Sequence, residues 1–488
     1  MKNREITGQS EKSTTILVRI LSLFLLSSFF FSATAQEPAK KDAKPKYEKV
    51  SSHVILITIS GLGTEELSEA EVNKLQLPAL SALRDKGSRA LSVESVYPSQ
   101  VIPAHATIAT GTLPADHGIT SDYPFNETLG TQAQEPFTLT KELKGDPIWE
   151  IAKHSGLTTA AIGYPLTAGA ALDFNLPVLI DTNDTGEIAS HLQIFSNQYV
   201  NPKNLTAQIS SLLKSEVLKP NEKLKDISVH LRLDHYKAVA AAYIIENAHP
   251  NLLLINFQSF MSAERQYGRG SREAFSALEL IDEELKKIVD STERAGLAVT
   301  FLILSDFGSM RTEQLFKPNV LLAKKGWLTL GDHGQITSWR VIVQALGGSA
   351  AVFVKDNGNE QFIREVEKYF SDFHDKPDSP IWRVVLRHEA SKLGADPRAA
   401  FYLDAAPDIA FSSGTKGGRT SNATDRAGNG YLPSRSEIRG TLIIAGKGIK
   451  QGQKINYVRL IDIAPTIARL FGLEMRTARG RVLSEVIE

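Results

Sequence analysis

Short runs of apolar, mostly β-branched residues recur along the chain and predict buried strands. The first run, HVILITIS at 53–60, stops at a glycine-rich turn, as expected of a fully buried strand that ends in a loop. Similar runs occupy residues 158–165, 251–258, 299–308 and 439–448. Segments with helical spacing separate them, which predicts an α/β fold with a mostly parallel central sheet sandwiched by helices. In such sheets, functional side chains lie at the C-terminal ends of the strands.

Two helices and one more strand are predicted between the first two of these runs. Leu75, Leu77, Leu80 and Leu83 have helical spacing, and this helix is expected to end at Gly87. The stretch ALSVESVYP alternates like a strand. After it, IPAHATIATG predicts a helix with a proline in its first turn, where proline is tolerated.

Two further regions are predicted to pack beside this sheet. Residues from about 186 to 246 have a largely helical pattern and predict a peripheral helical region. The segment from about 345 to 411 contains SAAVFVKD, EQFIREVEKYFSDF and IWRVVLRHEASKLG, which predict a small α+β insertion.

The N-terminus has the pattern of an export signal. Lys and Arg residues precede a short apolar run from Ile20 to Phe31, and an Ala-Thr-Ala sequence follows, so residues 1–35 predict a cleaved signal peptide. Residues 36–50 are rich in Lys, Pro and Ala and predict a flexible linker. The mature domain is expected at 51–488, in the periplasm or outside the cell, with no stable membrane insertion after cleavage.

Composition excludes several classes of function. The 55 Lys and Arg residues balance 55 Asp and Glu residues, so no basic field for a nucleic-acid polymer is expected. The chain has no Cys, which excludes disulfides, thiolate nucleophiles and Cys-based zinc sites. Any metal would therefore have to be held by His and carboxylates.

The order and spacing of the motifs resemble the alkaline phosphatase superfamily, in its type I phosphodiesterase/nucleotide pyrophosphatase branch. The resemblance runs from about His53 to the C-terminus. It rests on eight segments in the family's order: the first strand with SGLG, YPSQVIPAHATIATGTLPADHGI, DPIWEIAKHSGL, GYP, SDFG, FKPNVLLAKKG, GYLPSRSEIRGTLIIAGKGI and IDIAPTIARLFGL. It implies an alkaline phosphatase-like fold and a phosphodiester hydrolase that uses two divalent cations, typically zinc.

The residues at the family's active-site positions differ from those that the resemblance implies. In the family, carboxylates and imidazoles hold both cations, and a Thr or Ser between them attacks phosphorus. The nucleophile position falls on Val101, which has no hydroxyl, and Ala104 replaces an Asn that helps bind the phosphoryl oxygen in some relatives. The six metal-ligand positions fall on Ser60, Met261, Arg265, Asp306, Phe307 and Asn429. Only Asp306 among these six matches the family.

Misalignment is not expected to explain these losses, because the residues around them hold their register. Gly61, Pro103, Gly268, Gly308 and Gly430 all stand at the family's spacing. The chain therefore predicts a site that has lost its nucleophile and five of six metal ligands, and no cofactor is expected.

The polar residues that remain near the site are expected to be structural. His105, just past a helix start, is expected to be packed or hydrogen-bonded, and His117 before Gly118 to serve as a turn or capping residue. A lone strand-end Asp such as Asp306 more often caps a helix or bonds loop amides than holds a metal by itself.

These observations favour a catalytically inactive pseudoenzyme with a binding or regulatory role. Arg265 and the nearby Arg269 are candidates for an anion site, because they replace the positive charge of the metals. The competing interpretation is an internal ion pair between Arg265 and Asp306. The expected partners are an anionic small molecule or a regulated protein.

Two other functions stay open. One is an active metal-dependent phosphodiester or phosphomonoester hydrolase, with Ser99 or Ser60 as nucleophile and Asp306, Glu264 or a displaced His as its partner, although the sequence places no base beside either serine. The other is a purely structural envelope protein, which predicts no specific small ligand.

Overall fold

The computed structural model describes residues 47–177, 198–213 and 222–488. The predicted signal peptide and most of the predicted linker lie outside the described residues and stay predictions. In the described part of the chain, no helix is long and apolar enough to cross a membrane.

The last residues of the stretch expected to be a linker are attached to the folded unit. The backbone N–H of Tyr47 donates to the carbonyl of Gly472 at 3.3 Å, and that of Val50 donates to the carbonyl of Leu470 at 2.9 Å. Val50 also packs against the apolar core. Residues 47–50 thus already belong to the folded unit, a few residues before the predicted boundary at 51.

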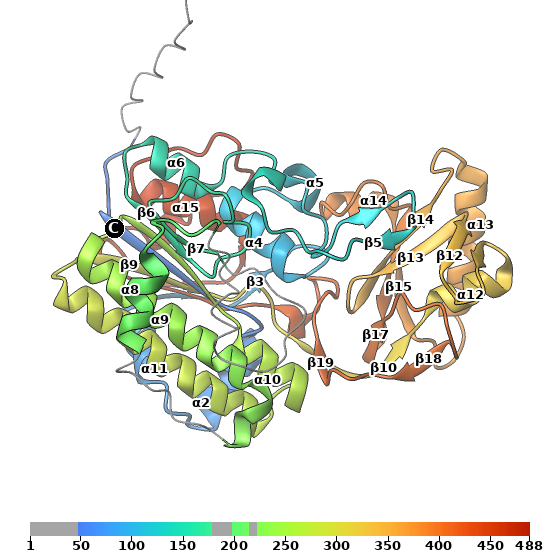
Figure 1. The fold of residues 1–488 in the computed structure, drawn as a ribbon, viewed down its shortest axis with the longest axis horizontal. Helices are drawn as coiled ribbons and strands as arrows, with labels where there is room; N and C mark the ends of the chain where they lie inside the picture. Colours follow the sequence, from blue (N-terminus) through green and yellow to red (C-terminus); the bar gives the residue numbers. More distant parts are fainter. Residues whose placement is uncertain (1–46, 178–197, 214–221) are drawn as a thin grey trace, which may run out of the picture. The chain divides into compact units, whose positions relative to one another are not determined.

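An eight-stranded sheet forms the centre of the fold (Figure 1), with the order β21-β2-β20-β9-β1-β8-β6-β7. Its strands are β1 (His53–Ile59), β2 (Gly87–Ala90), β6 (Thr159–Ile162), β7 (Phe174–Leu176), β8 (Leu252–Phe257), β9 (Val299–Leu304), β20 (Leu442–Gly446) and β21 (Lys454–Ile455). β1 runs parallel to both neighbours, with Ile57 opposite Ile255 of β8 and Ile303 of β9. The carboxyl ends of β1, β8 and β9 therefore meet at one edge of the sheet.

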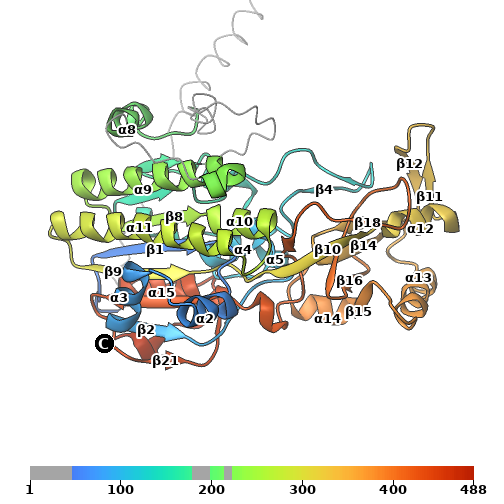
Figure 2. The same cartoon turned by 90° about the horizontal axis from the view of Figure 1, so that it is seen from below.

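Successive residues of β1 point into two apolar cores, one on each face of the sheet. Ile55 and Ile57 belong to one core and Val54 and Leu56 to the other. The first core includes residues of α3 (Pro78–Lys86), α9 (Ser228–Ala248) and α11 (Arg272–Arg294). The second includes residues of α4 (Val101–Thr110), α6 (Ile148–His154) and α15 (Ile463–Leu470). Figure 2 shows α9 and α11 side by side along the sheet.

The predicted α/β fold is therefore confirmed, including its mostly parallel sheet. Each of the five long apolar runs contains a strand of this sheet. Of the eight strands, β20 alone runs antiparallel to its neighbours, β9 and β2. Apolar content could not reveal this direction, because a fully buried strand has the same pattern in either orientation.

Two local predictions between β1 and α4 are wrong. Helix α3 begins at Pro78, so Leu75 and Leu77 precede it, and an unpredicted helix, α2 (Thr64–Val72), follows β1. The stretch ALSVESVYP holds only the last residue of β2 and the two-residue β3 (Val93–Glu94), which pairs with β22 (Val458–Arg459). The alternation of apolar and polar residues in this stretch arises because some of its side chains are buried, although most of the stretch is not a strand.

The segment expected to form an α+β insertion contains a four-stranded antiparallel sheet with the order β13-β14-β16-β15. Its elements are β13 (Val341–Ala345), β14 (Ser349–Val354), α13 (Glu360–His374), β15 (Ile381–Leu386), α14 (Arg387–Lys392) and β16 (Phe401–Ala405). Nearby in the chain are β10 (Met310–Phe316), α12 (Pro318–Lys325), β17 (Asp408–Phe411) and β18 (Thr420–Asn422). The first strand of the four-stranded sheet thus starts before residue 345.

The described part of the predicted helical region at 186–246 is mainly helical. It contains α8 (Leu205–Leu213), a 3-10 helix at Glu222–Ile227 and most of α9. Residues 186–197 and 214–221 lie outside the described residues. Helix α10 (Ser259–Tyr267) follows β8 and carries the next candidate residues.

Candidate functional site

The loops after β1 and β9 meet at Asp306. Its Oδ2 accepts a hydrogen bond from the Ser60 hydroxyl at 2.9 Å, and its Oδ1 accepts the backbone N–H of Gly61 at 3.2 Å and of Phe307 at 3.0 Å. Burial raises the pKa of Asp306 to about 7, although these three donors lower it. The carboxyl group thus joins two loops by bonding their amides, which is the structural role expected for it.

Ser60 lies beside a carboxyl group, contrary to the expectation that no base adjoins it. The Ser60 hydroxyl is also 3.2 Å from Oδ1 of Asn256, at the end of β8. Both Ser60 and Asp306 are only 1% exposed. A substrate cannot reach a nucleophile and a base that are both closed off from solvent.

Val101 is the first residue of α4, where the family would place its nucleophile. Its side chain is partly exposed and packs against the apolar core. The N–H of the next residue, Ile102, donates to Oδ1 of Asp122 at 2.8 Å, so a carboxyl group already occupies this helix N-terminus. The sequence did not identify Asp122, because no spacing rule links a residue 20 positions away to the helix start.

The other candidates on and before α4 are buried. Ala104 is fully buried in the core, and Ser99 is 0% exposed. The Ser99 hydroxyl lies 2.9 Å from the carbonyl of Val96 and 3.0 Å from that of Tyr431. Carbonyl oxygens accept its hydrogen but cannot act as a general base, so Ser99 is not activated as a nucleophile.

Both histidines near the site are fully buried. Nδ1 of His105 is 2.8 Å from the carbonyl of Val101, which assigns the ring proton to Nδ1, so Nε2 accepts from the Thr58 hydroxyl at 3.0 Å. Burial lowers the pKa of His105 to about 4. His117 accepts the N–H of Ile119 at 3.2 Å at the end of its short helix, and burial lowers its pKa to about 3. Both rings are neutral near pH 7 and have the structural roles predicted for them: His105 joins α4 to β1, and His117 binds the turn that follows its helix.

Two of the metal-ligand positions are filled by core side chains. Met261, on α10, is 5% exposed and Phe307 is 0% exposed, and both belong to the same apolar core as Ala104. Gly61 approaches Met261 so closely that a Cβ at Gly61 would lie 2.9 Å from the Met261 sulfur. The space beside the β1 loop is therefore occupied by hydrocarbon and a thioether.

Arg265 contacts Asn429 instead of Asp306. Its Nη2 donates to Oδ1 of Asn429 at 3.3 Å, and the Asp306 oxygens are engaged by the donors described above. The predicted Arg265–Asp306 ion pair is therefore wrong. Two buried donors, Nε of Arg265 and Nδ2 of Asn429, have no hydrogen-bond partner in the structure.

Arg269 is not available as an anion ligand, which corrects the second part of the predicted anion site. Its Nη2 pairs with Glu65 at 2.8 Å, and its Nε donates to the buried Glu66. Glu264, the other candidate base, is 0% exposed, and burial and the neighbouring Glu66 raise its pKa well above the usual range. A neutral, buried carboxylic acid cannot serve as a base for an external substrate.

The residues present do not fit the two zinc ions that the family resemblance implies. Zinc prefers imidazole, carboxylate and thiolate ligands, whereas these positions hold a hydroxyl, a thioether, a guanidinium, a phenyl ring and an amide beside one Asp. In residues 47–177, 198–213 and 222–488, no group of three His, Asp or Glu side chains is placed to hold a metal ion. We therefore derive no step that involves metals.

Sequence comparisons match the chain to one protein family and to several distant relatives. Residues 54–427 match the type I phosphodiesterase / nucleotide pyrophosphatase family. Ectonucleotide pyrophosphatase/phosphodiesterase family member 1 of Homo sapiens is 33% identical over 93 residues, which are 18% of this chain and 10% of that protein. Venom phosphodiesterase 2 of Crotalus adamanteus is 24% identical over 241 residues, which are 48% of this chain and 24% of that protein. The chain thus spans a quarter or less of these relatives.

Solved structures share the fold over most of the chain. Murine and human ectonucleotide pyrophosphatase / phosphodiesterase 5 each match with a TM-score of 0.60 and 15% identity, covering 89% of this chain and all of theirs. An inactive form of the murine protein in complex with AMP matches with a TM-score of 0.60 and 14% identity, over 90% of this chain and all of that one. These structures show the fold, and the match over residues 54–427 shows that this chain belongs to the type I phosphodiesterase/nucleotide pyrophosphatase family.

Proposed function

We propose that this chain is an exported member of the family that does not catalyse phosphodiester hydrolysis and instead has a binding or regulatory role. The observation that carries the proposal is the state of the six metal-ligand positions. Met261 and Phe307 are buried in the apolar core, and both oxygens of Asp306 are engaged by neighbouring loops. Export to the periplasm or the outside of the cell rests on the pattern of residues 1–35.

Loss of the metals removes the main source of catalysis in this family. Two cations stabilise the attacking and leaving oxygens of the in-line displacement, and one of them lowers the pKa of the nucleophile. Such electrostatic stabilisation is worth several kcal/mol in the transition state. The polar groups that remain, including Ser60 and Asp306, are too deeply buried to replace it.

The ligand proposed for this site is a small anion that contacts Arg265. The Nε–H of Arg265 and the Nδ2 amide of Asn429 are buried donors without partners, and a buried unpaired donor costs about 1–3 kcal/mol. A carboxylate or phosphate oxygen would satisfy both. Arg269 is left out of this site because Glu65 and Glu66 already neutralise it.

The active-hydrolase alternative has less support. It requires Ser60 or Ser99 to meet a phosphodiester, yet Ser60 is 1% exposed and Ser99 is 0% exposed. The balanced charge of the chain also gives no support for a nucleic-acid polymer as partner.

Hydrolysis of bis(p-nitrophenyl) phosphate by the purified protein, with and without added Zn²⁺, tests the proposal. We expect no turnover above the rate of buffer in either condition. Turnover that is lost in Asp306→Asn would overturn it.

Calorimetric titration with AMP and with inorganic phosphate tests the anion site. Arg265→Gln should weaken binding of either anion about tenfold. The control Arg476→Gln, at a side chain that is 88% exposed, should leave it unchanged. Equal binding by the wild type and Arg265→Gln would reject Arg265 as the anion ligand.

A further inference from the structure

A pocket of about 300 Å³ lies between α2, α3 and β20, and the site described above contributes no residue to it. Its apolar lining comprises Leu67, Leu75, Leu77, Leu80 and Ile443. Its volume is at the lower end of ligand pockets, which run from about 300 to 1,000 Å³. At about 30 Å³ per water-sized group, it holds a ligand of about ten non-hydrogen groups.

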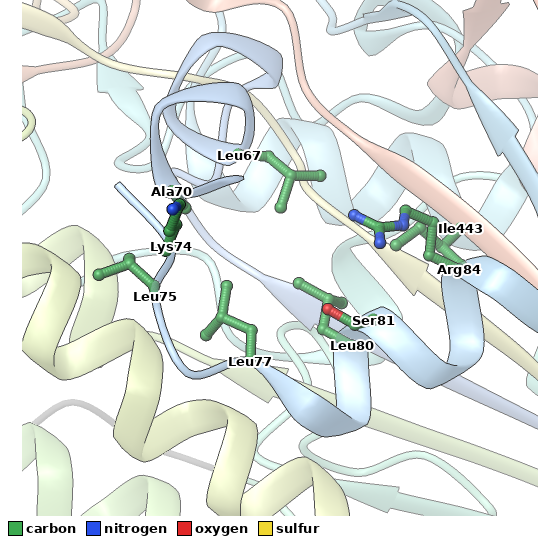
Figure 3. A pocket seen from close by; sticks show the side chains of 9 residues that line it. All are labelled: Leu67, Ala70, Lys74, Leu75, Leu77, Leu80, Ser81, Arg84 and Ile443. Carbon is green, nitrogen blue, oxygen red and sulfur yellow. The ribbon is translucent and has the colours of Figure 1, made fainter. Parts of the chain in front are cut away.

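The polar groups of the described side chains that line this pocket include two cations. Lys74, Ser81 and Arg84 contribute them, and Figure 3 shows Lys74 and Arg84 on opposite sides with leucine side chains between them. Arg84 donates from Nε to Asp85 at 3.0 Å, so its charge is partly neutralised. Lys74 is therefore the main positive group that faces a ligand here.

Lys74 has the left-handed backbone conformation of a helix C-cap, and the N–H of the next residue, Leu75, donates to the carbonyl of Ala70 at 3.1 Å. Its φ is 54°, in the left-handed region, just after the end of α2. Helices commonly end with Gly or Asn in this conformation, and another L-residue there costs about 1–2 kcal/mol. A lysine differs from Gly or Asn at this position by placing an ammonium group beside the pocket.

We propose that this pocket binds a small amphipathic anion, with a short alkyl chain against the leucines and a carboxylate or phosphate head group at Lys74. The alkyl chain gains about 0.8 kcal/mol for each methylene that it buries. The head group gains a charge-assisted hydrogen bond from the lysine. The site is separate from Arg265, so it does not depend on the function proposed above.

Calorimetric titration of the purified protein with four probes of equal chain length tests the ligand class. The probes are hexanoate, hexyl phosphate, hexanol and hexyltrimethylammonium. We expect at least one anion to bind about tenfold more tightly than the alcohol and the cation, and the stronger anion identifies the natural head group. Equal affinity for all four probes, or no binding of either anion, would overturn the proposal.

Three variants test the place of binding. Lys74→Asn keeps a residue that tolerates the left-handed turn but removes the charge, so it should weaken the anion about tenfold without lowering the melting temperature. Ser81→Phe should fill the pocket and abolish binding, with folding checked by circular dichroism. Lys324→Asn, at an exposed lysine of α12, should leave binding unchanged. Unaltered affinity in Lys74→Asn, or lost affinity in Lys324→Asn, would reject the site.

Discussion

Replacing Arg269 by Gln should destabilise the fold in a pH-dependent way, because its guanidinium is the charge partner of a buried carboxyl group. The Glu66 side chain is 0% exposed and accepts a hydrogen bond from Nε of Arg269, which is itself 20% exposed. Nη2 of the same guanidinium reaches Glu65 at 2.8 Å. The substitution thus removes the positive charge that Glu66 contacts.

The expected magnitude follows from the burial of Glu66. Breaking a buried ion pair by removing one partner costs about 3–5 kcal/mol when the remaining group is charged. Burial raises the pKa of Glu66 from 4.5 to about 7 in spite of Arg269, which lowers it. Without Arg269 this pKa should rise further, because desolvation is then unopposed.

The sign of the pH dependence is determined by this upward shift. Because the pKa of Glu66 is higher in the folded state than in the unfolded state, its stabilising contribution is complete below about pH 4.5 and is lost as pH rises through about 7. A shift of this size corresponds to about 3 kcal/mol. In Arg269→Gln the loss should continue above pH 7, so the difference from the wild type should stay nearly constant between pH 5 and pH 6 and grow above about pH 7.

Urea unfolding followed by tryptophan fluorescence at pH 5, 6, 7 and 8 measures this difference. We expect Arg269→Gln to cost about 1 kcal/mol at pH 5 and about 2 kcal/mol at pH 8, because Glu66 takes up a proton instead of staying charged, and one group changes stability by at most about 1.4 kcal/mol per pH unit. The double variant with Glu66→Gln should recover most of the loss at pH 8, and Arg476→Gln should show none. A loss in Arg269→Gln that is the same at every pH would refute the reasoning.

Three further substitutions have expected outcomes. Asp306→Ala leaves the N–H groups of Gly61 and Phe307 without an acceptor. It should lower the free energy of unfolding by about 3 kcal/mol in urea titrations. Asp306→Asn keeps an oxygen acceptor for these groups and should lower it by less than half as much. Gly430→Ala should destabilise by about 2 kcal/mol or more, measured in the same way, because its φ is 88° and a Cβ would lie 1.8 Å from the carbonyl oxygen of Leu346. Val101→Thr, alone or with Ser60→Asp, should produce no turnover of bis(p-nitrophenyl) phosphate with added Zn²⁺, because Met261 and Phe307 still fill the space; measurable turnover would contradict this.

Strands β1, β6, β8, β9 and β20 could be predicted from sequence because all of their residues except one at an end of β1 and of β20 are buried. Ile55 and Leu56, on opposite faces of β1, are both buried, so apolar residues follow one another along the strand. ALSVESVYP misled for the same reason, since Val96 is 3% exposed and Tyr97 is 0% exposed although neither lies in a strand. Apolar residues in the sequence indicate burial, but they do not indicate which backbone groups pair with one another in a sheet.

The positions of the candidate site could be predicted, but most of their contacts could not. The glycines around Ser60 and Asp306 fixed the register, and the bond between these two residues joins positions 246 apart. Arg265 and Arg269 looked equivalent in the sequence, and only the fold brings Glu66, 203 residues away, against Arg269. Whether Arg265 or Arg269 can bind an anion therefore depends on the carboxyl groups that the fold places beside each of them.

Equilibrium dialysis of the purified protein against Zn²⁺, followed by elemental analysis, tests the central claim that the metal centre has been lost. Met261, Arg265 and Phe307 supply no ligand for zinc, and Asp306 is held by three hydrogen bonds. We therefore expect well under one zinc ion per chain, with the same value for Asp306→Asn. About two zinc ions per chain, with zinc lost in Asp306→Asn, would contradict the account.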